Sequence, residues 1–132
     1  MAQTRAPIGA TLVVGGGIGG MQAALDLADA GFKVHLIERR SAVGGRMVQL
    51  DKTFPTNDCS MCTISPRLVH IGMHPNIVLH TGATLERLEG EAPAFRATVR
   101  QRARFVDPDR CKACGECVEA CPVELPSRFD GG

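Results

Sequence analysis

The chain has 132 residues, which is room for one modest domain or for one small domain and part of another. Its hydrophobic fraction of 44% and its charged fraction of 22% are typical of a globular protein and exclude wholesale disorder. The net charge of +1 and the absence of Trp and Tyr give no reason to expect nucleic acid or an anionic membrane as a partner.

The N-terminal stretch lacks the long apolar segment and cleavage site of a secretory signal. No apolar run approaches the ~20 residues that span a bilayer, so no membrane span is expected. We therefore expect a cytoplasmic protein. In that compartment thiols stay reduced, so the six cysteines need an explanation other than structural disulfides.

The first part of the chain predicts a βαβ unit. Residues 10–14 are short, β-branched and apolar, which is typical of a buried strand. A glycine-rich turn follows, and apolar residues then recur at helical spacing as far as Ala30. Residues 33–38 predict a second strand. Because such units nearly always have parallel strands, the fold class is α/β with a Rossmann-like half-domain.

The next segments are less regular. Residues 39–64 have little periodicity and predict an extended functional loop. Ser65 and Pro66 predict the N-cap and first residue of a short helix that ends near Met73. A third strand is expected at residues 77–79, and the alternation around residues 95–100 predicts a half-exposed strand.

Three glycines lie between the first predicted strand and the helix, at the spacing G-x-G-x-x-G: Gly15, Gly17 and Gly20. The first permits a tight turn, the second lets the backbone approach a pyrophosphate, and the third allows close packing of helix on strand. Glu38 ends the second strand, where a carboxylate can accept hydrogen bonds from a ribose. The pattern predicts a dinucleotide site.

The residues after Glu38 favour FAD over NAD. Arg39 follows the acid directly, and Gly44, Gly45 and Arg46 come shortly after it. This arrangement resembles the large family of flavoproteins with two dinucleotide folds, in which a Gly-Gly pair contacts FAD. Two glycines let a second backbone segment close over the cofactor, and Arg46 either offsets phosphate charge or is a solvated arginine.

Four cysteines near the C-terminus follow the bacterial ferredoxin pattern C-x2-C-x2-C-x3-C-P: Cys111, Cys114, Cys117 and Cys121. Three thiolates at this spacing hold one 4Fe–4S cluster, and the fourth reaches a second cluster. Both clusters then need further thiolates. Since the chain stops eleven residues after Cys121, we expect them to come from a longer chain or a partner chain.

Cys59 and Cys62 form a separate C-x2-C pair. The sequence leaves three interpretations open: two ligands of another cluster, a redox pair near the flavin, or two inert thiols.

The histidines and a group of arginines give no clear sign of a functional site. The four histidines show no ligand spacing, and alternating arginines indicate a solvated strand face or a docking surface for an acidic redox partner: Arg96, Arg100, Arg102 and Arg104.

Three stretches of this sequence resemble the flavin and iron–sulfur subunit of heterodisulfide reductase: VVGGGIGGMQAALDLADAGFKVHLIE, GGRMVQLDKTFPTNDCSMCTISPRLV and FVDPDRCKACGECVEACPVELPSRFD. The resemblance implies a flavin domain interrupted by a two-cluster ferredoxin insertion. It implies that residues 8–104 are an incomplete FAD-binding region and that residues 105–132 are part of a ferredoxin-type module. It also implies that Cys59 and Cys62 are cluster ligands completed from a further N-terminal region.

The function expected from this resemblance is electron transfer between flavin and 4Fe–4S clusters in a multi-subunit oxidoreductase. The expected partners are the other subunits of a heterodisulfide reductase-like complex and a ferredoxin or similar carrier. No residue is a persuasive general acid, base or nucleophile. The alternatives are a non-catalytic ferredoxin-like carrier, an FAD-linked thiol–disulfide oxidoreductase that uses Cys59 and Cys62, and a gene fragment with no stable fold.

Overall fold

The computed structural model describes residues 9–107 and 109–124. These residues form two compact units that divide between Arg102 and Ala103. Each unit is described by itself. No helix in the described part of the chain is long and apolar enough to cross a membrane.

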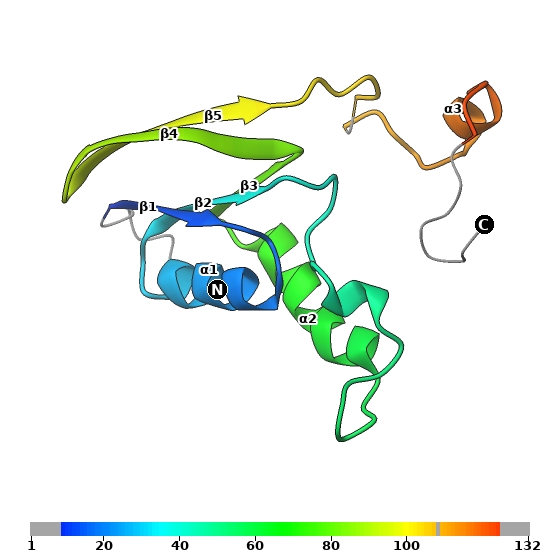
Figure 1. The fold of residues 1–132 in the computed structure, drawn as a ribbon, viewed down its shortest axis with the longest axis horizontal. Helices are drawn as coiled ribbons and strands as arrows, with labels where there is room; N and C mark the ends of the chain where they lie inside the picture. The colour runs from blue at the N-terminus through cyan, green and yellow to red at the C-terminus, as the bar shows by residue number, and fades with distance from the viewer. Residues whose placement is uncertain (1–8, 108, 125–132) are drawn as a thin grey trace. The chain divides into compact units, whose positions relative to one another are not determined.

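A three-stranded parallel sheet is the centre of the first unit (Figure 1). Its strands are β1 (Ala10–Val14), β2 (Lys33–Glu38) and β3 (Ile77–Thr81), and β2 lies between the other two. Because β2 is covered on both sides and both edges, four of its six residues are buried, including Glu38. Because β1 and β2 are parallel, their carboxyl ends lie at the same edge of the sheet. There β1 continues into the turn before α1, and β2 continues into the loop before η1.

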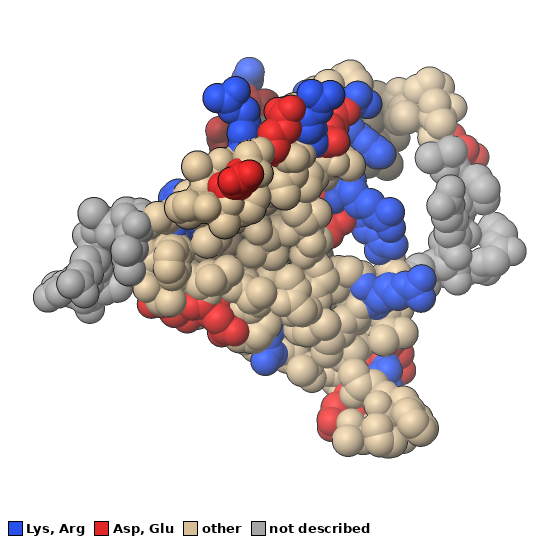
Figure 2. All heavy atoms as spheres, turned by 60° about the vertical axis from the view of Figure 1, so that its left-hand side comes forward, with Lys and Arg blue, Asp and Glu red and all other residues tan. Residues whose placement is uncertain are grey.

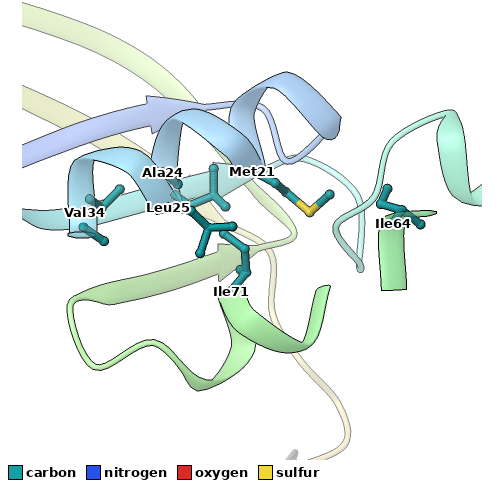
Figure 3. Close-up of a cluster of buried hydrophobic side chains, with 8 residues drawn as sticks. Met21, Ala24, Leu25, Val34, Ile64 and Ile71 are labelled. Carbon is teal, nitrogen blue, oxygen red and sulfur yellow. The ribbon is translucent and has the colours of Figure 1, made fainter. Parts of the chain in front are cut away.

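Two helices cover one face of this sheet: α1 (Ile18–Asp29) and α2 (Ser60–Met73). A short 3-10 helix, η1 (Met47–Gln49), precedes α2. Figure 3 shows side chains of α1 gathered with Val34 of β2 and with two isoleucines of α2. The buried core cluster consists of Met21, Ala24, Leu25, Ala28, Val34, Leu36, Ile64 and Ile71. Burial of these apolar side chains supplies the main driving force for the unit.

An antiparallel hairpin lies over the other face of the sheet (Figure 1). It consists of β4 (Ala83–Glu91) and β5 (Ala94–Gln101), with an irregular register between Leu85 and Arg87. A cavity of about 680 Å³ separates the hairpin from the sheet. Its walls are mostly apolar, and His35 and His80 lie on the sheet side.

The first two predicted strands and the α1 helix are confirmed, and the third strand is two residues longer than predicted. The predicted start of the second helix is wrong. Helix α2 begins at Ser60 and contains Pro66 in its interior, where proline cannot donate to the Cys62 carbonyl. The early turn forms because the Cys59 sulfur caps it and because Ser60 and Ile64 are fully buried. Strand β4 was not predicted, since most of its residues are exposed and apolar alternation is weak.

The second unit holds the cysteine-rich segment and one short helix, α3 (Glu116–Glu119). Its chain turns through left-handed backbone at Ala113 and Gly115. No described residue of α3 is buried, so the unit has little apolar core of its own.

Candidate functional site

The glycine-rich turn between β1 and α1 has the geometry that its sequence predicts. Gly15 has a φ of +106°, and its N–H donates to the Ile37 carbonyl at 2.7 Å. A Cβ on Gly20 would overlap the Gly15 carbonyl oxygen, so only glycine allows α1 to pack this closely on β1. Gly17 is the N-cap of α1, and no side chain caps the helix there. The first N–H groups of α1 are thus available to an anion.

Glu38 is fixed by two backbone hydrogen bonds. It is only 7% exposed. One carboxylate oxygen accepts from the Gly16 N–H at 2.7 Å, and the other accepts from the Arg40 N–H at 2.8 Å. Each oxygen keeps a further lone pair, so the carboxylate can still accept from ribose hydroxyls. The acid therefore also ties the glycine turn to the end of β2, a second role that the sequence pattern does not reveal.

The second glycine segment packs directly on the first. Gly44 and Gly45 have φ values of +116° and +63°. The Gly44 N–H donates to the Gly16 carbonyl at 2.7 Å, and a Cβ on Gly45 would lie 2.9 Å from the Gly17 Cα. The two loops therefore meet backbone to backbone. This contact explains the Gly-Gly pair physically, because any side chain would push the loops apart.

Gly16 is a residue that the motif analysis missed. Its N–H and its carbonyl bind Glu38 and Gly44, and a Cβ there would lie 2.7 Å from the Val43 side chain. The only sequence signal is that Gly16 is the middle of three consecutive glycines. It connects the three parts of the predicted dinucleotide site.

Two small cavities adjoin Glu38 and Arg39. One, of about 200 Å³, is mainly apolar and is lined by Val14, Gly15, Ile37, Glu38, Arg39, Ala83, Thr84 and Leu85. The other, of about 180 Å³, is lined by Glu38, Arg39, Arg40, Gly45 and Arg46. An apolar wall, a carboxylate and cationic side chains beside a helix N-terminus suit the ring, the ribose and the phosphates of a dinucleotide, in that order. These residues fit such a ligand.

Cys59 and Cys62 are joined by a disulfide, with their Cα atoms 5.3 Å apart. The sequence predicts no structural disulfide and leaves a redox pair open as one of three interpretations of these two cysteines, and a bond between them is compatible with that interpretation. Cys59 is the N-cap of α2, and its sulfur accepts a hydrogen bond from the Cys62 N–H at 3.1 Å. One helical turn brings the two sulfurs together. Their assignment as cluster ligands stays a prediction.

The four C-terminal cysteines are free and exposed. The Cys111 N–H donates to the Asp107 carbonyl at 3.0 Å, which closes a turn before the first cysteine. The left-handed residues Ala113 and Gly115 then reverse the chain between successive cysteines. A short segment with four accessible thiols supplies three ligands of one 4Fe–4S cluster and one ligand of a second, so these residues fit such groups.

The predicted residues thus lie in three groups. The eight expected cofactor-binding residues gather around the carboxyl ends of β1 and β2: Gly15, Gly17, Gly20, Glu38, Arg39, Gly44, Gly45 and Arg46. Cys59 and Cys62 lie at the start of α2. The other four cysteines belong to the second unit.

Two groups of histidines come together, although no ligand spacing is identified among them from the sequence. His70 and His74 are four residues apart, which places their side chains close together along α2. Ligand atoms of Asp29, His70 and His74 lie within 4.8 Å of one another. However, Nδ1 of His74 accepts the Asn76 N–H at 3.1 Å, so its Nε2 carries the proton and donates to Asp29 at 3.2 Å. A metal would need the lone pair on Nε2. The arrangement is a hydrogen-bonded link between α1 and α2.

The second histidine group is a pair on β2 and β3. Nδ1 of His35 lies 3.1 Å from Nε2 of His80, and the rings are stacked with centroids 5.4 Å apart. Burial lowers the pKa of His80 below its usual value, and the neighbouring His35 lowers it further. Both rings face the cavity under the hairpin.

The arginines of β5 do not form an uninterrupted basic surface. Figure 2 shows basic and acidic side chains interleaved along the upper edge of the molecule, where Figure 1 places β4 and β5. Arg100 forms an ion pair with Glu86, and Arg87 pairs with Glu89 at 3.2 Å. This mixture favours the interpretation as a solvated strand face.

Two protein families match the sequence. Residues 13–78 match the NAD(P)-binding Rossmann-like domain, and residues 104–126 match the 4Fe-4S binding domain. The α/β fold is also seen in L-proline dehydrogenase from P. horikoshii, with a TM-score of 0.56 and 24% identity over 70% of this chain and 19% of that one. This likeness shows the fold alone.

Curated relatives cover nearly the whole chain. The chain is 51% identical to a CoB–CoM heterodisulfide reductase iron–sulfur subunit, of the A type, from Methanopyrus kandleri. It is 50% identical to the A-type subunit of the H(2):CoB-CoM heterodisulfide,ferredoxin reductase from Methanothermobacter marburgensis. Both alignments cover 121 residues, which are 92% of this chain. The chain spans 18% of the length of these relatives.

Proposed function

The chain belongs to the family of NAD(P)-binding Rossmann-like domains and is a homologue of the A-type subunit of heterodisulfide reductase, and from this we propose that it carries electrons between FAD and 4Fe–4S clusters. It acts as part of an oxidoreductase. Because the relatives are subunits, its partners are the other subunits of a heterodisulfide reductase-like complex and a ferredoxin or similar carrier. Such a complex would be cytoplasmic.

One observation carries the flavin half of this proposal: Glu38 holds the glycine turn while the second glycine segment lies on it. The N–H groups at the start of α1 bind the pyrophosphate, and Glu38 accepts from the ribose. Arg39 and Arg46 lie beside Glu38 and offset phosphate charge. The bound flavin supplies one- and two-electron chemistry, whereas the protein supplies position and charge.

The cluster half depends on the cysteines of the second unit. Cys111, Cys114 and Cys117 hold one 4Fe–4S cluster, and Cys121 reaches a second one. Cys59 and Cys62 are ligands of another cluster. In this proposal, residues 8–104 belong to the flavin-binding region and residues 105–132 to the ferredoxin-type module.

Anaerobic purification of the chain tests both halves. We expect absorbance near 450 nm, flavin adenine dinucleotide released on denaturation, and iron with inorganic sulfide. A cluster spectrum without flavin would contradict the flavin half. Zinc in place of iron and sulfide would contradict the cluster half, because zinc binds thiolates without sulfide.

A further inference from the structure

We propose that Cys59 and Cys62 are a reversible thiol–disulfide redox site whose oxidised form withholds both sulfurs from iron. The control of iron binding rests on the proposed function, in which these cysteines are cluster ligands. The reversible redox site does not, because it follows from the local structure at the start of α2. Both sulfur atoms belong to exposed residues, so a small reductant can reach them.

Besides the hydrogen bond from the Cys62 N–H to the Cys59 sulfur, the backbone around the pair is held by contacts that do not involve sulfur. Ser60, between the two cysteines, is fully buried. Its hydroxyl donates to the Leu50 carbonyl and shares this proton with the Asp51 carbonyl, and its N–H donates to the Asp51 carbonyl at 3.2 Å. These bonds persist when the disulfide opens. The two thiols therefore stay close, and the disulfide can re-form within the same turn.

A second set of contacts fixes Cys59 itself. Its carbonyl accepts from the N–H of Thr63 at 3.2 Å and from the hydroxyl of Thr63 at 3.0 Å. Cys59 also forms an antiparallel bridge with Lys52. The cysteine is thus fastened to the start of the helix and to the preceding loop. Opening the bond changes the sulfurs and leaves this frame in place.

The exchange balances with a dithiol as reductant. One thiolate of the dithiol attacks a sulfur of the Cys59–Cys62 bond, which releases one cysteine and forms a mixed disulfide with the other. The second thiol of the reductant then attacks its own sulfur in the mixed disulfide and releases the second cysteine. The protein bond breaks and a disulfide forms in the reductant. Two electrons and two protons pass to the cysteines. Only the resulting thiolates can bind iron, because a sulfur in a disulfide has no thiolate charge to donate.

Trypsin separates this pair from the other cysteines. Cleavage after Lys52 and Arg67 gives a peptide with Cys59 and Cys62 only, and cleavage after Lys112 puts three other cysteines in a second peptide. The full chain is equilibrated in mixtures of reduced and oxidised dithiothreitol, labelled with N-ethylmaleimide and digested. We expect the peptide of residues 53–67 to change from no label to two labels in one two-electron step.

Two variants make this experiment decisive. In C62S, the peptide of residues 53–67 should lose the two-electron step, whereas C114S should keep it unchanged. The proposal of a redox site would be overturned if the peptide of residues 53–67 carried two labels without any dithiol. It would also be overturned by a disulfide between this peptide and the one that follows Lys112. If the protein lacks flavin or ferredoxin-type iron but the peptide of residues 53–67 still shows the two-electron step, the proposed function is wrong and the redox site is still supported.

Cobalt(II) tests whether oxidation of the Cys59–Cys62 pair prevents metal binding, because this metal binds thiolates without sulfide. The variant C111S/C114S/C117S/C121S keeps only the Cys59–Cys62 pair as a source of thiolates. We expect thiolate-to-cobalt absorbance after reduction and none before it. Equal absorbance in both states, or none in either, would overturn the claim that oxidation controls metal access.

Discussion

Glu38 and Gly16 are 22 residues apart in the sequence, yet the Glu38 carboxylate accepts the Gly16 N–H at 2.7 Å. The same carboxylate accepts the Arg40 N–H. The acid that is expected to bind ribose thus also holds the loop that is expected to bind pyrophosphate. Loss of this one group should therefore affect stability and cofactor affinity together.

Replacing Glu38 by Gln should lower the free energy of unfolding by about 1–3 kcal/mol, because the amide nitrogen cannot accept a buried backbone N–H. Flavin affinity should fall at least about tenfold, which is about 1.4 kcal/mol. Urea unfolding and flavin titration measure the two effects. Glu89→Gln is the control, since Glu89 is an exposed hairpin residue. An E38Q variant that binds flavin as tightly as the wild type would contradict the assignment.

Gly45→Ala should weaken flavin binding and destabilise the protein by about 1–2 kcal/mol, because its φ of +63° disfavours a side chain. The new Cβ would also press on Gly17. Gly72→Ala is a matched control, because a Cβ there meets no atom within 4 Å and lies inside α2. Alanine there should stabilise the helix by up to about 1 kcal/mol. Equal flavin affinity in the two variants would argue against contact between the loops.

The stability of the protein should depend on pH through His80. Because the pKa of His80 is lowered on folding, the unfolded chain binds more protons just below pH 6.5. The free energy of unfolding should therefore fall as the pH drops from 6.5 toward the folded pKa, and this contribution should be fully present above 6.5. Urea unfolding measured at several pH values across this range should show that the free energy of unfolding of His80→Gln changes less with pH than that of the wild type.

Pro66→Ala should stabilise α2 by about 1–2 kcal/mol. The alanine N–H can donate to the Cys62 carbonyl, which a proline in the helix interior leaves without that bond. Part of the gain is offset because the unfolded chain becomes more flexible. Thermal or urea unfolding measures the change, and Ser65→Ala gives the smaller effect of helix propensity alone. A destabilised P66A variant would show that the proline shapes the turn in a way the hydrogen bonds do not reveal.

Cys114→Ser should remove iron and sulfide from the second unit without changing flavin content. The cysteine belongs to a compact unit separate from the glycine loops, so the two cofactors should respond independently. Metal analysis and flavin release measure both quantities in one sample. Unchanged iron would remove this cysteine from the ligand set.

The sequence alone was sufficient for features that depend on neighbouring residues. The alternation between strand and helix periods located β1, α1 and β2, because each element is specified by its own side-chain pattern. The glycine spacing and the cysteine spacing likewise pointed to the Rossmann-like and 4Fe-4S matches. In each of these cases the chemistry requires residues a few positions apart, so the signal lies within one short segment.

Tertiary structure decided the features that join distant segments. The contact of Gly45 with Gly17, the pairing of His35 with His80 and the start of α2 at Ser60 all depend on which backbones approach each other. No local period encodes such an approach. Proline favoured a helix start at Ser65, but burial of Ser60 and Ile64 outweighed this local preference because packing contributes more than one lost hydrogen bond.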